Sequence, residues 1–209
     1  MFLLRDPTQY FYAMVAIFLV LPVHEWAHAY TAYLLGDHTA RFQGRMTLDP
    51  TKHLTLMGSI CAIFFGFGWA KPVPINPYNF TQIKNRKLGF AICALAGPMS
   101  NFLMGLIFTI IYKLFILINA PYLLVEFTVF LVQINISLMV FNFLPVPPLD
   151  GSRIWSMFLK DETYNKLLMN EQTITLVIFF LLFTGLLDIP LSFLTRLVIK
   201  FLDLLTWFI

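Results

Sequence analysis

Residues 10–35 read YFYAMVAIFLVLPVHEWAHAYTAYLL, an almost continuous apolar run that contains the pattern His24-Glu25-Trp26-Ala27-His28. Gly36 follows the run, and glycine commonly ends helices. At 1.5 Å per residue, a helix over this stretch is long enough to cross a bilayer core of about 30 Å. The stretch therefore predicts a membrane-spanning helix that keeps ionisable side chains inside the membrane.

The composition of the whole chain agrees with a membrane environment. Only 12% of the 209 residues are charged and 59% are hydrophobic, whereas a soluble domain has about 25% charged residues. Mean hydropathy is +0.77. These values exclude a soluble enzyme, a disordered tail, a coiled coil and a nucleic-acid-binding protein of ordinary composition. We expect a multi-pass protein of the cell membrane, with the lipid bilayer as its surroundings and no nucleic acid as a partner.

Further apolar runs predict an all-α integral membrane bundle of about five to six membrane segments. After the first span they cover residues 54–69, 88–118, 123–144, 173–187 and 191–209. A chain of this length leaves no room for a separate soluble module. We therefore expect one polytopic domain over residues 1–209, with a core at about 10–155 and C-terminal helices at about 172–209.

The region between the first and second full spans is harder to interpret. An alternating pattern that begins at Ala40 could form a short strand, and residues 54–69 cover only about 23 Å as a helix. That segment could be a short span, a re-entrant segment or a buried half-helix. Re-entry places ten basic residues on one face, as expected for cytoplasmic loops, so we favour it, with the first span running from outside to cytoplasm. These residues are Arg41, Arg45, Lys52, Lys71, Lys84, Arg86, Lys87, Arg153, Lys160 and Lys166.

The pattern in the first span is typical of a zinc hydrolase. Residues four apart share one helix face, so His24 and His28 can bind one zinc ion, and Glu25 stands beside them as a candidate general base. The alternative is a set of hydrogen-bonded polar residues in the bundle interior. Because burying ionisable groups in a membrane is costly, their presence favours a functional site.

A catalytic zinc ion usually has three protein ligands. Asp150 is the best candidate for the third, because Pro145, Pro147 and Pro148 end the preceding span and free the chain to turn back, while Gly151 allows close approach. Asp150 could instead cap a turn. His53 and His38 remain possible substitutes, and Glu126 is expected at the opposite face.

Three separated motifs resemble the site-2 protease family of intramembrane zinc metalloproteases. They are the HExxH pattern, Gly97-Pro98-Met99-Ser100-Asn101, and the stretch from Asn142 to Leu149-Asp150-Gly151. Residues 67–77 and 44–50 are similar to the compact prokaryotic branch. The resemblance covers roughly residues 20–155, and the chain carries neither the PDZ nor the CBS domain found in many family members.

This resemblance implies one zinc ion per chain, bound by His24, His28 and Asp150, with Glu25 activating water. It also implies that Asn142 hydrogen-bonds the substrate backbone or the developing oxyanion, and that an extended region before Gly97 pairs with an unwound substrate strand. The implied substrates are proteins with transmembrane helices, cleaved for signalling or for clearance of membrane peptides. Their selection would rest on the bundle or on an unknown regulatory membrane partner.

Two other classes remain open. One is another membrane zinc hydrolase, such as a prenyl-protein endopeptidase or a lipid amidase, although those would take their third ligand from a different position. The other is a zinc-binding scaffold or transporter without catalytic activity.

Overall fold

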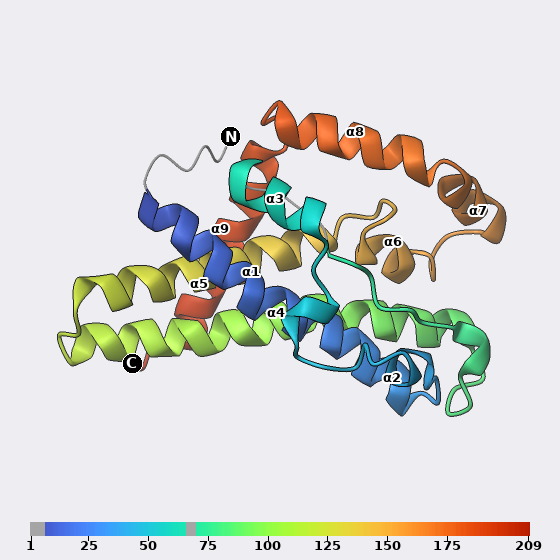
Figure 1. Cartoon of the computed structure of the whole chain (residues 1–209), viewed down its shortest axis with the longest axis horizontal. Coiled ribbons are helices and arrows are strands. Elements are labelled where there is room, and N and C mark those ends of the chain that lie inside the picture. Colours follow the sequence, from blue (N-terminus) through green and yellow to red (C-terminus); the bar gives the residue numbers. More distant parts are fainter. Residues whose placement is uncertain (1–6, 66–69) are drawn as a thin grey trace.

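The computed structural model describes residues 7–65 and 70–209, and these form a helical bundle (Figure 1). Its centre is an antiparallel pair, α4 (Arg86–Leu117) and α5 (Tyr122–Asn142), joined by a short turn. The first helix, α1 (Pro7–Leu34), packs against α4, and α9 (Asp188–Leu205) packs mainly against α5. The described residues form no strand, only an isolated antiparallel bridge, so the prediction of an all-helical fold is confirmed for them.

Helix α4 carries the contacts that hold the bundle together. The Asn85 side chain accepts a hydrogen bond from Leu88 N and so caps its first turn. A methyl group on Gly105 would lie 2.5 Å from Ile136 Cδ1, so this glycine lets α5 approach closely. Ile136 and Leu202 are fully buried in the core cluster shared by α5 and α9. The helix is continuous through Pro98.

The segment between α1 and α4 is compact and mostly irregular. The short strand predicted from Ala40 is wrong: α2 (Thr39–Phe42) is one helical turn, in which Phe42 N donates to His38 O at 3.0 Å. Just before it, the Asp37 carboxylate accepts a hydrogen bond from Thr39 N. The 3-10 turn η1 (Pro50–Lys52) and α3 (Leu56–Phe65) follow. Before α4 the chain forms the 3-10 turn η2 (Pro77–Asn79).

The two ends of the segment around α3 meet each other. Leu54 pairs with Ala70 in the antiparallel bridge, and Lys71 N donates to His53 O at 2.6 Å. The chain therefore leaves this point and returns to it. Helix α3 has ten residues, about 15 Å, and residues 66–69 of the predicted segment lie outside the described residues.

After α5 the chain forms α6 (Asp150–Trp155), α7 (Asp161–Met169) and α8 (Glu171–Phe183) before it reaches α9. Among the described residues, α4 and α5 are each long and apolar enough to cross a membrane. The pair α7 and α8, bent by 67°, could form a third span. The structure thus supports two or three spans, and the larger number of membrane segments stays a prediction.

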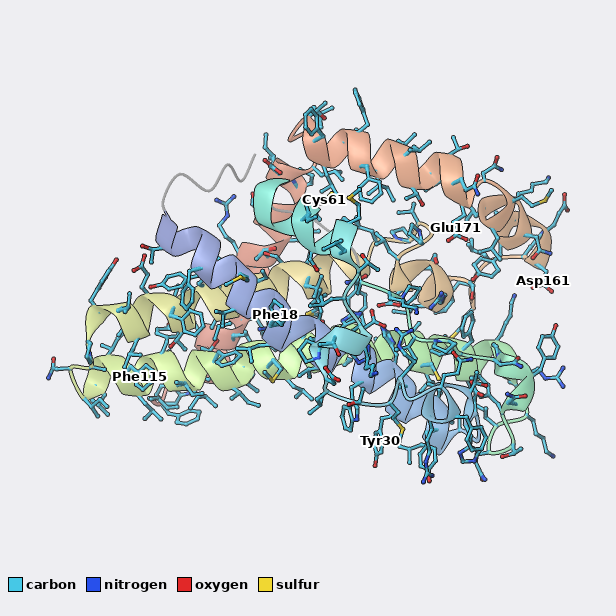
Figure 2. All side chains as sticks on the ribbon, viewed as in Figure 1. Phe18, Tyr30, Cys61, Phe115, Asp161 and Glu171 are labelled. Carbon is cyan, nitrogen blue, oxygen red and sulfur yellow. The ribbon has the colours of Figure 1, made fainter. Side chains whose placement is uncertain are left out.

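Several basic residues lie at one end of the bundle. One end of the α4–α5 pair is surrounded by α2, α7 and the loop that precedes α4, and the α4–α5 turn lies at the other end (Figure 1). Figure 2 shows Asp161 at the first end and Phe115 near the second. The first end contains Arg41 in α2, Arg86 at the start of α4 and Lys166 in α7. These are three of the ten basic residues that the re-entry prediction assigns to one face.

Candidate metal centre

The two histidines of α1 meet the first residue of α6 in the interior of the bundle. His24 Nε2 lies 3.1 Å from His28 Nε2, and Asp150 Oδ2 lies 3.2 Å from the former and 3.1 Å from the latter. All three side chains are buried, with 5–7% of each residue exposed. Within the described parts of the chain, these are the His, Cys, Asp or Glu side chains placed to share one metal ion.

The other nitrogen of each imidazole faces a hydrogen-bond acceptor. His28 Nδ1 lies 2.7 Å from Cys93 O, and His24 Nδ1 lies 2.5 Å from Asn101 Oδ1. Because a carbonyl oxygen only accepts, both Nδ1 atoms carry a hydrogen, and each ring turns its Nε2 toward Asp150. Second-shell partners of this kind orient histidine ligands in metal sites.

The converging atoms fit a zinc ion. Two lone pairs and a carboxylate oxygen within 3.2 Å repel one another unless a cation or a proton lies between them. In a tetrahedral zinc site with ligands at about 2.0–2.1 Å, the ligand atoms are roughly 3.3 Å apart. The observed separations are close to that spacing, and two imidazoles with one carboxylate form a known ligand set for catalytic zinc.

Gly97 of α4 forms the wall against which both histidines lie. A methyl group at this position would stand less than 3.0 Å from His28 Nε2 and 2.6 Å from His24 Cε1. Real Cβ atoms do not approach other atoms so closely. The absence of a side chain at Gly97 is therefore what lets α4 pack against this face of α1.

The turn between α5 and α6 carries Asp150 to the histidines. A Cβ on Gly151 would collide with the carbonyl oxygens of Leu144 and Phe143, so only glycine permits this close turn. Pro147 is buried in the same turn. Arg153 Nη1 lies 4.0 Å from Asp150 Oδ1, the carboxylate oxygen that does not face the histidines.

Glu25 is held by the irregular segment that precedes η2. Its Oε2 accepts a hydrogen bond from Val73 N at 3.1 Å, and the residue is 9% exposed. Arg45 supports the same segment, because Nη2 donates to Lys71 O at 2.7 Å and to Pro72 O at 3.3 Å. The backbone of residues 71–73 thus lies directly beside the candidate base.

The hydrogen bonds and ring contacts of the other predicted residues are made with groups other than the two histidines. The Asn142 amide donates to Leu138 O within its own helix, at 3.0 Å. His53 is fully buried in the loop, where Nε2 donates to Thr47 O at 2.7 Å, and His38 packs against Tyr33. Glu126 lies near the start of α5, the end of the helix far from Asp150.

Sequence reasoning did not assign roles to the groups that surround the histidines. Asn101, Asn135, the Cys93 carbonyl and the Val73 amide reach the site from segments distant in sequence. Asn101 and Asn135 both lie in apolar runs of the sequence, where a buried amide requires a hydrogen-bond partner, so both could have been noticed. Backbone groups carry no sequence signal at all.

Comparison with known proteins shows where this arrangement belongs. The model of Peptidase family M50 matches residues 118–186, which include Asn142 and Asp150. Relatives share the name "Putative zinc metalloprotease": YwhC of Bacillus subtilis is 40% identical over 149 residues, covering 68% of this chain and 67% of that protein. Rip2 of Mycobacterium tuberculosis is 30% identical over 170 residues, covering 78% and 63%. No solved structure matches the chain significantly.

The chain belongs to peptidase family M50, the site-2 protease family of membrane zinc metalloproteases, as the motifs indicated. The particular proteins it is similar to are YwhC and Rip2, together with MJ0611 of Methanocaldococcus jannaschii, which is 32% identical over 108 residues, 50% of this chain and 52% of that protein. The alignments span about two thirds of the length of YwhC and of Rip2.

Proposed function

We propose that this protein is an intramembrane zinc endopeptidase that hydrolyses peptide bonds within or near the transmembrane helices of other membrane proteins. The observation that carries the proposal is the buried convergence of His24 Nε2, His28 Nε2 and Asp150 Oδ2 at 3.1–3.2 Å. Membership of peptidase family M50 supports the same reaction class.

In this proposal His24, His28 and Asp150 bind one zinc ion. The chemistry that zinc supplies when bound is to polarise a carbonyl and to make water acidic enough to attack at neutral pH. Glu25 accepts the proton of the attacking water and passes it to the leaving amine. The Asn142 amide leaves Leu138 O and donates to the developing oxyanion, as such amides do in other hydrolases.

The irregular segment beside Glu25, residues 71–73, suits an unwound substrate. A helix hides its carbonyl groups in internal hydrogen bonds, so cleavage requires local unwinding. Residues 71–73 are held by Arg45 and Glu25, which places non-helical backbone next to the candidate base. A substrate strand that pairs with this backbone would enter the site in the conformation that hydrolysis needs.

We also propose that α1, α4, α5, α8 and α9 are membrane segments in the cell membrane and that α3 re-enters. The bridge between Leu54 and Ala70 supports re-entry, because the chain returns to its starting point. The basic end of the bundle would then face the cytoplasm. Large exposed apolar side chains on these helices, such as Phe18, Leu103 and Phe201, would contact lipid.

The test compares the membrane proteome of cells that produce the wild-type protein with that of cells producing Glu25→Gln. We expect particular transmembrane peptides to accumulate uncut with Glu25→Gln, while purified protein retains the same zinc content. Glu126→Gln is the matched control, since it neutralises a glutamate of another helix and should leave processing unchanged.

Processing at the wild-type rate by Glu25→Gln would refute the proteolytic mechanism. Retained zinc with no cleaved substrate in wild-type cells would favour a scaffold. A lipid or prenyl-peptide product would indicate another membrane hydrolase.

A further inference from the structure

Two asparagines form a buried chain of hydrogen bonds behind His24. Asn101 of α4 is 1% exposed and Asn135 of α5 is fully buried. Asn101 Nδ2 donates to Asn135 Oδ1 at 3.2 Å, and Asn135 Nδ2 donates to Leu131 O at 2.8 Å. Buried amides are costly unless they are paired, so these contacts account for both side chains inside an apolar interface.

The orientation of both amides in this series of hydrogen bonds is determined at its Leu131 end. Leu131 O is a backbone carbonyl and can only accept, so the Asn135 amide nitrogen must face it. The Asn135 oxygen therefore points to Asn101 and requires the Asn101 nitrogen as its donor. The remaining Asn101 oxygen then faces His24 Nδ1, at 2.5 Å. Each amide has one orientation that satisfies every contact.

His28 is oriented by a different kind of group. Its Nδ1 donates to the backbone carbonyl of Cys93, which no substitution removes. His24 depends instead on side chains, which substitution can remove or replace. Asn101 is therefore the point at which the orientation of the histidine pair can be changed without touching a proposed ligand.

We propose that Asn101 is a positioning residue for His24 and that Asn135 holds Asn101 in its working orientation. The pair keeps hydrogen on His24 Nδ1 and directs its Nε2 toward Asp150 and His28. This inference rests on the proposed function, because it concerns the same metal centre. It predicts that metal affinity depends on two asparagines that touch neither the metal nor the substrate.

The experiment measures the zinc dissociation constant of purified full-length protein by competition with a chelator, and the thermal midpoint with and without zinc. Loss of a second-shell partner typically weakens metal binding about 10- to 100-fold, and we expect this range for Asn101→Leu. Asn135→Leu should weaken binding less, since Asn101 can still offer its oxygen. Asn101→Asp keeps an acceptor for His24 but removes the donor to Asn135 Oδ1, so it should bind zinc more weakly than the wild type and more tightly than Asn101→Leu.

Thr109→Val and Thr128→Val are matched controls. Each removes a buried hydroxyl from the same helix as one asparagine, and each hydroxyl bonds only within its own helix, to Gly105 O and Leu124 O. We expect unchanged zinc affinity. A purely structural role for Asn101 would instead lower the thermal midpoint equally with and without zinc.

Unchanged zinc affinity in Asn101→Leu would overturn the inference, and so would a loss in Asn101→Asp as large as that in Asn101→Leu. If Asn101→Leu does not fold, Asn135→Leu and Asn101→Asp decide in the same assay. His24→Ala separates the two proposals: if it too leaves zinc affinity unchanged, the metal centre and the proposed function fail together. If it abolishes binding while Asn101→Leu does not, only the positioning role fails.

Discussion

Gly97→Ala tests whether the close approach of α4 creates the metal centre. The added methyl group would lie 2.6 Å from His24 Cε1 and closer still to His28 Nε2, while ordinary contact begins at 3.4 Å, so the rings or the helix must move by at least about 0.8 Å. Metal ligands tolerate deviations of about 0.2 Å. The movement also strains the hydrogen bonds from the imidazoles to Asn101 Oδ1 and Cys93 O, each contributing about 0.5–1.5 kcal/mol.

We expect Gly97→Ala to weaken zinc binding at least about 100-fold, the upper end of the loss seen when a second-shell partner is removed. The substitution itself favours a helix by roughly 0.5–1 kcal/mol, so a general loss of helix stability would not explain the effect. Zinc content of the purified protein and cleavage of a reconstituted transmembrane substrate measure the outcome.

Gly105→Ala is the control on the same helix. Its methyl group would meet Ile136 Cδ1 at 2.5 Å, so it also disturbs packing, but at the α5 interface away from the histidines. We expect lower stability with zinc retained. Wild-type zinc affinity and cleavage in Gly97→Ala would refute the reasoning.

Three further predictions concern the surroundings of the site. Val73→Pro removes the N–H that donates to Glu25, so peptide cleavage should fall about 10-fold with zinc content unchanged. Val73→Ala keeps the N–H and should behave like the wild type. Equal cleavage rates in Val73→Pro and the wild type would exclude a role for this amide. In Asp37, burial opposes the charged form, but donors on Thr39, Asn76 and Asn79 outweigh it and lower the carboxyl pKa. The contribution of this carboxylate to folding stability is therefore fully present above its unfolded pKa of about 3.9 and is lost as pH falls through the lower folded pKa. Asp37→Asn should lower the stability of this loop by about 1.5–3 kcal/mol near neutral pH. The measurement is limited proteolysis of the α2 loop, which should become faster. Lys113 Nζ donates to Thr206 O at 2.8 Å, so Lys113→Met should expose the C-terminal end of α9 to proteases, whereas Lys200→Met should not. If Lys113→Met is as resistant to proteolysis as the wild type, this contact does not hold α9.

The sequence predicted the features that follow from local spacing. Apolar runs located α4 and α5 to within a few residues, and the four-residue interval placed His24 and His28 on one face of α1. The structure also brings Asp150 to these histidines, the juxtaposition that the prolines after α5 suggested.

Other features depend on contacts between distant segments and left no local pattern. The strand expected at Ala40 is a helical turn instead, and the Asp37 carboxylate before it accepts hydrogen bonds from Thr39 N and from Asn76 N, a residue distant in sequence that alternation over a few residues does not reveal. The amide of Val73 reaches Glu25 only because the loop after α3 folds back on α1. Asn101 could be recognised as part of a motif, but its direction toward His24 follows from Leu131 on another helix.

The measurement that tests the metal centre most directly is zinc X-ray absorption on purified full-length protein, compared with Asp150→Asn and with Asp203→Asn, a matched control on α9. We predict one zinc ion per chain with a first shell of two imidazole nitrogens and additional oxygen ligands. Asp150→Asn should lose most of the metal, and Asp203→Asn should keep it. A shell that contains sulfur, a single imidazole, or the same zinc content in Asp150→Asn would contradict the account.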